Sequence, residues 1–326
     1  MGILKKGLIV SCQATPEEPL HGSEIMARLA IAAEMGGAVG VRVNTYSDLC
    51  AVRKAVKIPI LGLIKTVHEG YWPYITTTME DVDLVVKSGA DIICIDATNY
   101  PRYDGNDFPT FYQLVREKYP GKEIMADIST YEEGVRADKL GCDYVATTLW
   151  GYTPDTTDKG ASLIQELREP NIELIAQLSK VCKAPIIGEG RFWDSTKAIE
   201  GFKAGAYGIT IGAGITRPQI ITKKIVDDIK AKHWRIFDDL YAILSFYNLE
   251  DYAGFTEKSR YVEDGMIHSY DPVGERYRIN YYASGVHRNN IKNGVCRYLN
   301  QLGVKYTIVN TGAKAKKETE FIKIQA

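Results

Sequence analysis

The chain has 326 residues, of which 45% are hydrophobic and 25% charged, and its formal net charge is -1. This composition is typical of a water-soluble globular protein, and the near-neutral charge argues against a nucleic-acid-binding protein. No stretch approaches the ~20 apolar residues of a membrane span, and the apolar run at residues 7–10 is too short for a signal peptide. The six cysteines form no CxxC pair, so we expect free thiols in a reducing cytoplasm and no structural metal or disulfide framework.

Strand-like and helix-like segments alternate along the first 230 residues. The apolar runs predict strands at residues 8–13, 38–43, 58–65, 91–97, 123–128 and 144–149, with two more at the starts of segments 186–191 and 209–218. Helical patterns follow at residues 23–35, 47–56, 79–87, 109–118, 131–140, 171–181, 195–204 and 218–231. Eight such pairs with strands that are apolar nearly throughout predict a (β/α)8 TIM barrel over residues 1–233. A doubly wound open sheet is the alternative.

The pattern changes after residue 233. Residues 234–249 and 289–302 have helical patterns, and strands are expected at residues 259–268, 276–282, 305–309 and 320–324. We therefore expect a small α+β accessory domain at residues 234–326. It holds ten of the 21 tyrosines, and aromatic-rich surfaces suit subunit contacts or sugar stacking. The role of this domain is open between oligomerisation, sugar binding and a second catalytic function.

Two glycine-rich segments, 186–191 and 209–218, end the last two strands of the predicted barrel. Glycine lets backbone amides approach a ligand closely, and the helix that follows each loop adds N–H donors. Loops after strands seven and eight often bind phosphate in TIM barrels. The segments therefore predict a phosphate site, although two ordinary strand-to-helix turns would look similar. The expected phosphate contacts are Gly190, Arg191, Gly212, Ala213 and Arg217.

Most of the other predicted strands end in a polar residue. Active sites of TIM barrels lie at these strand ends, and the residues in question are Gln13, Arg42, Lys65, Asp96, Asp127, Thr147, Thr148 and Glu189. Each could instead cap a helix or form an ion pair across the barrel. Lys65 is the clearest candidate for chemistry, because burial lowers the pKa of a lysine and a neutral amine can act as a base or a Schiff-base nucleophile. A permanent Lys65–Glu189 ion pair is the alternative. The spacing of His, Asp and Glu residues gives no metal-ligand cluster.

Several motifs resemble the bacterial N-acetylmannosamine-6-phosphate 2-epimerases over roughly residues 5–230. They include the segments Ser11-Cys12-Gln13-Ala14, Asp96-Ala97-Thr98, Ala126-Asp127-Ile128-Ser129, Glu132-Glu133-Gly134, Gly151-Tyr152-Thr153, Glu189-Gly190-Arg191 and Ile215-Thr216-Arg217-Pro218. Residues 234–326 have no counterpart in this resemblance. Three positions depart from the family pattern, namely Trp150 before Gly-Tyr-Thr, Thr66 after the lysine, and Asn99-Tyr100 after Asp-Ala-Thr.

The resemblance implies a cofactor-independent cytoplasmic isomerase that interconverts N-acetylmannosamine 6-phosphate and N-acetylglucosamine 6-phosphate in sialic acid catabolism. It implies that Lys65 and Glu189 are catalytic, that Gln13, Arg42 and Asp127 contact the sugar, and that Arg217 lies at the phosphate. Lys65 would move the proton on C2 while Glu189 takes part in proton exchange. Arg42 and Gln13 would stabilise the negative charge that develops on oxygen.

Two other functions remain open at the level of sequence. One is a different phosphosugar aldolase or isomerase that uses Lys65 as a Schiff base. The other is a phosphosugar-sensing protein that acts through its C-terminal domain. In each case the expected partner is a small phosphosugar, and we expect a homo-oligomer that binds neither nucleic acid nor membrane.

Overall fold

The computed structural model describes residues 2–157 and 169–229, and then residues 267–271, 276–280, 296–297, 300, 305–311 and 319–325. The chain divides into two compact units, Met1–Thr222 and Lys223–Ala326, which are described here one at a time. The predicted helix at residues 234–249 lies outside the described residues. So do most of the predicted helix at 289–302 and most of the predicted strand at 259–268.

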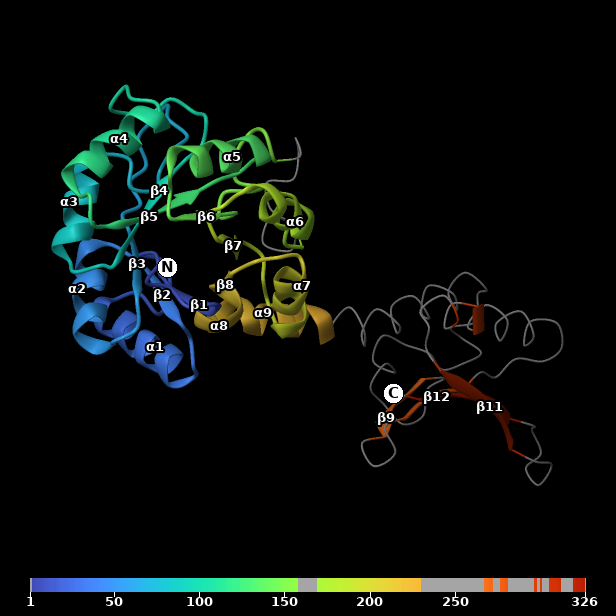
Figure 1. The fold of residues 1–326 in the computed structure, drawn as a ribbon. Helices are drawn as coiled ribbons and strands as arrows, with labels where there is room; N and C mark the ends of the chain where they lie inside the picture. The colour runs from blue at the N-terminus through green and yellow to red at the C-terminus, as the bar shows by residue number, and fades with distance from the viewer. Residues whose placement is uncertain are drawn as a thin grey trace. The chain divides into compact units, whose positions relative to one another are not determined.

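Eight parallel strands in the first unit form a closed barrel in the order β1 to β8 (Figure 1). Closure is direct, because β1 pairs in parallel with β2 on one side and with β8 on the other. The predicted TIM barrel is therefore confirmed over the open sheet. The strands are β1 (Gly7–Cys12), β2 (Gly40–Asn44), β3 (Ile60–Leu63), β4 (Ile92–Asp96), β5 (Glu123–Asp127), β6 (Tyr144–Ala146), β7 (Ile186–Glu189) and β8 (Gly208–Ile211).

Helices surround the barrel, at least one after each strand (Figure 1). Their starts are set by local capping: Thr78 with Asp81, and Thr130 with Glu133, form reciprocal capping boxes that satisfy backbone N–H groups at the first turn. The helices are α1 (Ser23–Met35), α2 (Tyr46–Ala55), α3 (Met79–Lys87), α4 (Phe108–Lys118), α5 (Tyr131–Leu140), α6 (Ile172–Val181), α7 (Ser195–Lys203), α8 (Ala213–Thr216) and α9 (Pro218–Ile229). None of the helices that the structure describes is long and apolar enough to cross a membrane.

The apolar core has two layers, as alternation along the strands requires. One cluster fills the inside of the barrel and includes Ile9, Leu61, Met125 and Ile187, while a larger cluster packs the outer face of the strands against the helices. The barrel floor is closed by Leu4, whose amide donates to the hydroxyl of Tyr144 at 3.1 Å. The packed interior leaves the opposite end, where the strands finish, as the place for polar groups. All six cysteines are free thiols, as expected.

The second unit contains a four-stranded antiparallel sheet in the order β11-β12-β10-β9. Its strands are β9 (Ile267–Asp271), β10 (Arg276–Asn280), β11 (Tyr306–Thr311) and β12 (Thr319–Gln325). Three of them coincide with predicted strands. The α+β domain expected at residues 234–326 stays a prediction, because most of that segment lies outside the described residues.

Candidate active site

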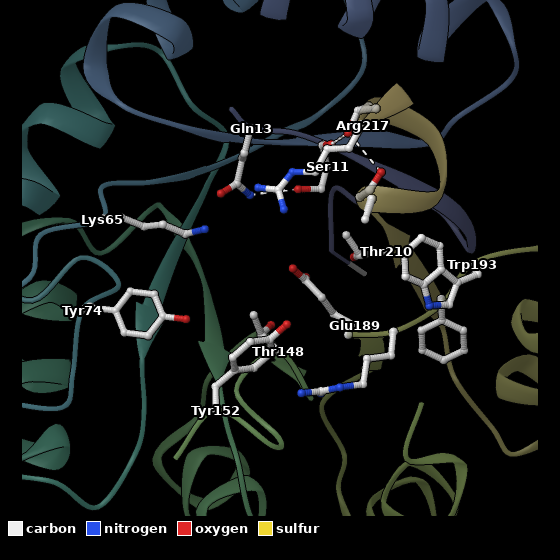
Figure 2. A pocket seen from close by; sticks show the side chains of 16 residues that line it. Ser11, Gln13, Lys65, Tyr74, Thr148, Tyr152, Glu189, Trp193, Thr210 and Arg217 are labelled. Carbon is white, nitrogen blue, oxygen red and sulfur yellow. Dashed lines mark hydrogen bonds between the residues drawn. The ribbon is translucent and has the colours of Figure 1, made fainter. Parts of the chain in front are cut away.

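A polar pocket of about 600 Å³ lies at the ends of the barrel strands. Its wall is made by residues of β1, β7 and β8 and by the segments that follow β1, β3, β6, β7 and β8, and Figure 2 shows side chains that point into it. The lining residues are Ser11, Gln13, Lys65, Tyr74, Thr148, Tyr152, Glu189, Gly190, Arg191, Phe192, Trp193, Thr210, Gly212, Ala213, Thr216 and Arg217. Of the ten predicted site residues, all but Arg42 and Asp127 are in this wall.

Lys65 extends into the pocket from the loop after β3, towards the carboxylate of Glu189 on the other side (Figure 2). Its backbone is held from two sides: its amide donates to Asn44 Oδ1 at 2.8 Å, and it forms an antiparallel bridge with Ile75. The amine touches the open space of the pocket but is enclosed by the surrounding protein, and this desolvation is the main cause of a pKa for Lys65 that is lowered to about 8. Arg42 and Arg217 contribute to the lowering, and Glu189 and Asp127 oppose it.

Glu189 is paired with Arg42 and not with Lys65. Its Oε2 lies 2.7 Å from Arg42 Nη1, and among the described residues it forms no ion pair with Lys65. The permanent Lys65–Glu189 ion pair considered above is therefore absent from this structure. Burial raises the pKa of Glu189, and nearby Asp127 adds to the rise, although Arg42 and Lys65 oppose it. A raised pKa favours the protonated form of the Glu189 carboxyl group, which suits it to a part in proton transfer.

Arg42 and Asp127 lie beneath the pocket floor. Arg42 is 1% exposed and donates hydrogen bonds to both carboxylate oxygens of Asp127, from Nη1 to Oδ1 at 2.8 Å and from Nη2 to Oδ2 at 2.7 Å. Its Nη1 also donates to Glu189 and to Thr148, whose hydroxyl in turn donates to Asp127. This charged network joins β2, β5, β6 and β7 and fixes the direction of the Glu189 carboxylate. The predicted direct contact of Arg42 and Asp127 with sugar stays a prediction, and their geometry favours an indirect role.

Two buried side-chain oxygen atoms in the pocket wall, one on Gln13 and one on Thr210, lack a hydrogen-bond partner among the described residues. Gln13 Nε2 donates to Ser11 Oγ at 2.9 Å, which leaves Gln13 Oε1 unpartnered. Thr210 Oγ1 on β8 is also unpartnered, and Thr210 is the register neighbour of Glu189. Unsatisfied buried polar groups are uncommon in folded proteins, so these two are suited to contact the hydroxyls of a bound sugar.

The glycine-rich loops after β7 and β8 approach each other closely. A Cβ on Gly214 would stand 2.6 Å from the carbonyl oxygen of Trp193, so only glycine fits this contact between the two loops. Gly190 has φ 102, and Arg191 also has a positive φ of 64, which turns the chain sharply at the end of β7. The backbone of Gly190, Gly212 and Ala213 borders the pocket at this corner.

The two arginines of these loops have different surroundings. Arg217 lines the pocket, and its Nε pairs with Glu18 Oε1 at 3.0 Å. Among the described residues, its two terminal nitrogens make no hydrogen bond, so the fork of Arg217 can hold an anion. Arg191 instead directs its guanidinium to the carbonyl oxygen of Trp150, 2.6 Å from Nη1, with the Trp150 and Tyr152 rings beside it. Its side chain secures the loop after β6, and only its backbone is suited to the phosphate role.

The departures from the family pattern are explained in part by these contacts. Trp150 supplies a ring for Arg191 at 5.1 Å. The hydroxyl of Thr66 donates to Asp81 Oδ1 at 3.4 Å. The side-chain oxygen of Asn99 accepts a hydrogen bond from Arg136 Nη1. All three therefore support loops around the mouth of the barrel.

Sequence reasoning missed four aromatic residues of the wall: Tyr74, Tyr152, Phe192 and Trp193. None of them ends a strand. Tyr74 reaches the pocket because residues 64–66 and 74–76 run antiparallel, with Thr76 N donating to Ile64 O at 2.7 Å. Asp96, which was expected at the strand ends, serves this same loop: it accepts the amide of Tyr74 at 3.1 Å and is only 1% exposed. Within the described residues no group of His, Cys, Asp and Glu side chains could hold a metal.

A closed barrel whose mouth presents an amine of lowered pKa and a buried carboxyl group beside two glycine-rich loops is typical of a TIM-barrel enzyme. Comparison with known proteins narrows the class. Residues 26–231 match the family model described as "Putative N-acetylmannosamine-6-phosphate epimerase". The chain belongs to this family of isomerases.

Individual relatives agree with that assignment. A Caldanaerobacter subterraneus protein described as "Putative N-acetylmannosamine-6-phosphate 2-epimerase" is 49% identical over 231 residues, which cover 71% of this chain and 94% of the relative. A Listeria welshimeri protein of the same description is 40% identical over 230 residues, with 71% and 95% covered. The solved structure of the N-acetylmannosamine-6-phosphate 2-epimerase from Clostridium perfringens aligns with a TM-score of 0.63 and 41% identity over 69% of this chain and 94% of that one.

Proposed function

We propose that this protein interconverts N-acetylmannosamine 6-phosphate and N-acetylglucosamine 6-phosphate, as a step in sialic acid catabolism. The observation that carries the proposal is the Lys65 amine, which is unpaired among the described residues, has a pKa lowered to about 8, and faces Glu189 across the pocket. Family membership supplies the substrate class, and the glycine-lined corner with Arg217 supplies a place for the phosphate group.

The reaction requires an acidic proton on C2, which exists only when the sugar is open and C1 is an aldehyde. The neutral amine of Lys65 takes this proton, the C2–H bond breaks, and its electrons delocalise onto the C1 oxygen as an enolate. Glu189, whose pKa is raised by burial, returns a proton to the opposite face of C2. Solvent then carries the proton from the Lys65 ammonium back to the Glu189 carboxylate. Phosphate binding far from C2 provides the energy that holds the open chain in place.

The test is turnover of N-acetylmannosamine 6-phosphate in heavy water, followed by NMR. The second sugar is expected to form with deuterium at C2, because proton return draws on groups that exchange with solvent. Lys65→Met, which keeps the length and apolar stem of the side chain, is expected to lower kcat by at least 10³-fold and to leave the thermal midpoint unchanged or higher. Epimerisation without deuterium at C2, or full activity of Lys65→Met, would contradict the proposal.

A lysine of lowered pKa is also suited to Schiff-base chemistry, so a second candidate function is a phosphosugar aldolase. Borohydride reduction in the presence of the phosphosugar distinguishes the two. The epimerase gives no covalent adduct at Lys65 in the mass spectrum. An aldolase gives a stable one.

A further inference from the structure

The enolate of the proposed reaction needs a hydrogen-bond donor at the C1 oxygen, and Arg42 does not supply it. Nη1 of Arg42 donates to Asp127, Glu189 and Thr148, and Nη2 donates to Asp127. The remaining nitrogen, Nε, is buried with an atomic surface below 1 Å². Both terminal nitrogens of Arg42 are therefore engaged beneath the pocket floor, its unpartnered Nε is buried, and Arg42 is not among the residues that line the pocket.

The other expected stabiliser, Gln13, presents an acceptor. Its amide nitrogen donates to Ser11, and its oxygen is the unpartnered atom. The hydroxyl of Thr148 donates its hydrogen bond to Asp127. Ser11 lies at the phosphate corner, where its Cβ is 3.3 Å from the position that a Cβ on Gly212 would take. Because the two stabilisers expected from sequence are occupied or of the wrong polarity, the enolate oxygen must find another donor.

Tyr74 has the properties of that donor. Its ring reaches the pocket on the same side as Lys65, with the hydroxyl directed inwards (Figure 2). Among the described residues the hydroxyl makes no hydrogen bond, so its proton is available to a ligand. Burial raises the pKa of Tyr74, and the nearby carboxylate of Asp96 raises it further, so the phenol stays protonated throughout the pH range of the reaction.

The backbone holds Tyr74 and Lys65 in one rigid unit. Tyr74 O accepts from Thr66 N at 3.0 Å, and the next residue, Ile75, bridges to Lys65. Asp96, anchored by Thr98 at 2.7 Å, accepts the amide of Tyr74. The base and the phenol are thus fixed on adjacent antiparallel segments, so a substrate placed against the amine also meets the hydroxyl. Preorganised donors of this kind stabilise developing charge without a reorganisation cost.

We propose that Tyr74 is a catalytic residue that donates its phenolic hydrogen bond to the C1 oxygen of the open-chain sugar and stabilises the enolate. This inference rests on the proposed function. Tyr74 keeps its proton throughout: the C2 proton goes to Lys65, the C2–H electron pair becomes the C1–C2 double bond, and the C1 oxygen carries the charge until C2 is reprotonated. Asp96 is the positioning residue for Tyr74.

The experiment compares Tyr74→Phe with Tyr71→Phe in the full chain. Tyr71 is on the same loop and 40% exposed, but it lies outside the pocket wall. Tyr74→Phe is expected to lower kcat about 100-fold with KM within about threefold, since loss of one oxyanion donor typically costs 10² to 10³ in kcat. Tyr71→Phe is expected to stay within twofold. The Tyr74 hydroxyl has no partner among the described residues, so its removal should leave the thermal midpoint unchanged.

A second readout is the rate at which deuterium enters C2 of recovered substrate, which reports enolate formation. It should fall in Tyr74→Phe by the same factor as epimerisation. Less than twofold loss of kcat in Tyr74→Phe would overturn the inference, and so would normal exchange with slow epimerisation. A 100-fold loss in Tyr152→Phe with none in Tyr74→Phe would assign the role to Tyr152. If the wild-type chain itself turns over no substrate, it is the proposed function that fails.

Discussion

At the scale of single residues, the charge state of Lys65 determines when the site can work. The amine must be neutral to accept a proton, and its pKa is lowered from the usual 10.5 to about 8. Deprotonation increases with pH, so activity that requires the neutral amine increases as well. We expect kcat/KM to rise as the pH approaches 8 and the Lys65 amine loses its proton, and to fall again at the pH where Glu189 loses the proton that it returns to C2.

This profile is measured at constant ionic strength with N-acetylmannosamine 6-phosphate. The second ionisation of the substrate phosphate, near pH 6, adds a separate lower limb, which a titration of the substrate alone identifies. A profile that is flat between pH 7 and pH 9 would mean that Lys65 is not the group whose deprotonation limits the reaction.

The residue types of the site could be predicted from sequence, but their directions could not. Polar residues at the ends of apolar strands indicated Lys65, Glu189 and Gln13 correctly as pocket residues. The same rule included Arg42, Asp127 and Asp96, which are turned inwards onto charged or backbone partners. Whether a strand-end side chain meets solvent or a neighbour depends on which groups lie opposite it in the closed barrel, and that information is absent from any one strand.

At the scale of elements, the eight barrel strands were predictable because their apolar side chains face two cores. The residues at which the strands end were less predictable. For example, β3 was expected at residues 58–65 but spans Ile60–Leu63. The chain leaves the barrel there to form the short antiparallel return that carries Lys65 and Tyr74. These antiparallel segments hold polar groups, so their sequence has no regular alternation of apolar residues. Sequence analysis therefore missed Tyr74.

The contact between the loops after β7 and β8 gives a prediction at this scale. A methyl group on Gly214 would stand 2.6 Å from the backbone oxygen of Trp193, so Gly214→Ala must push the two loops apart. The phosphate corner then widens, while Lys65 and Glu189 keep their positions. We expect KM to rise roughly tenfold, which corresponds to about 1.4 kcal/mol of binding, with kcat reduced less than threefold.

Steady-state kinetics of Gly214→Ala and Gly121→Ala test this expectation. Gly121 is a suitable control, because a Cβ there would have no heavy atom within 4 Å. An unchanged KM in Gly214→Ala would show that the close loop contact does not shape the phosphate site. A large fall in kcat with unchanged KM would place the disturbance at the reacting carbon instead.

At the scale of the whole molecule, residues 232–326 form an extension beyond the barrel that has no counterpart in the two relatives described above. Alignments that cover about 70% of this chain account for 94% and 95% of those two relatives, and the family model ends at residue 231. The barrel closes on itself through β1 and β8, and the described residues that line its pocket run from Ser11 to Arg217. The alignments and this lining both support a proposal in which the chemistry takes place within the first unit.

A chain that stops after residue 231 is accordingly expected to keep kcat and KM within about threefold of the full chain. The cut retains the whole of α9 (Pro218–Ile229), which a cut at the boundary between units after Thr222 would split. Light scattering of both proteins at the assay concentration shows whether residues 232–326 set the oligomeric mass. A soluble, folded barrel with more than tenfold lower kcat would mean that the extension contributes to the site. Unchanged kinetics with a smaller oligomer would assign it to assembly, because a segment that alters association but not turnover acts between chains and not within the pocket.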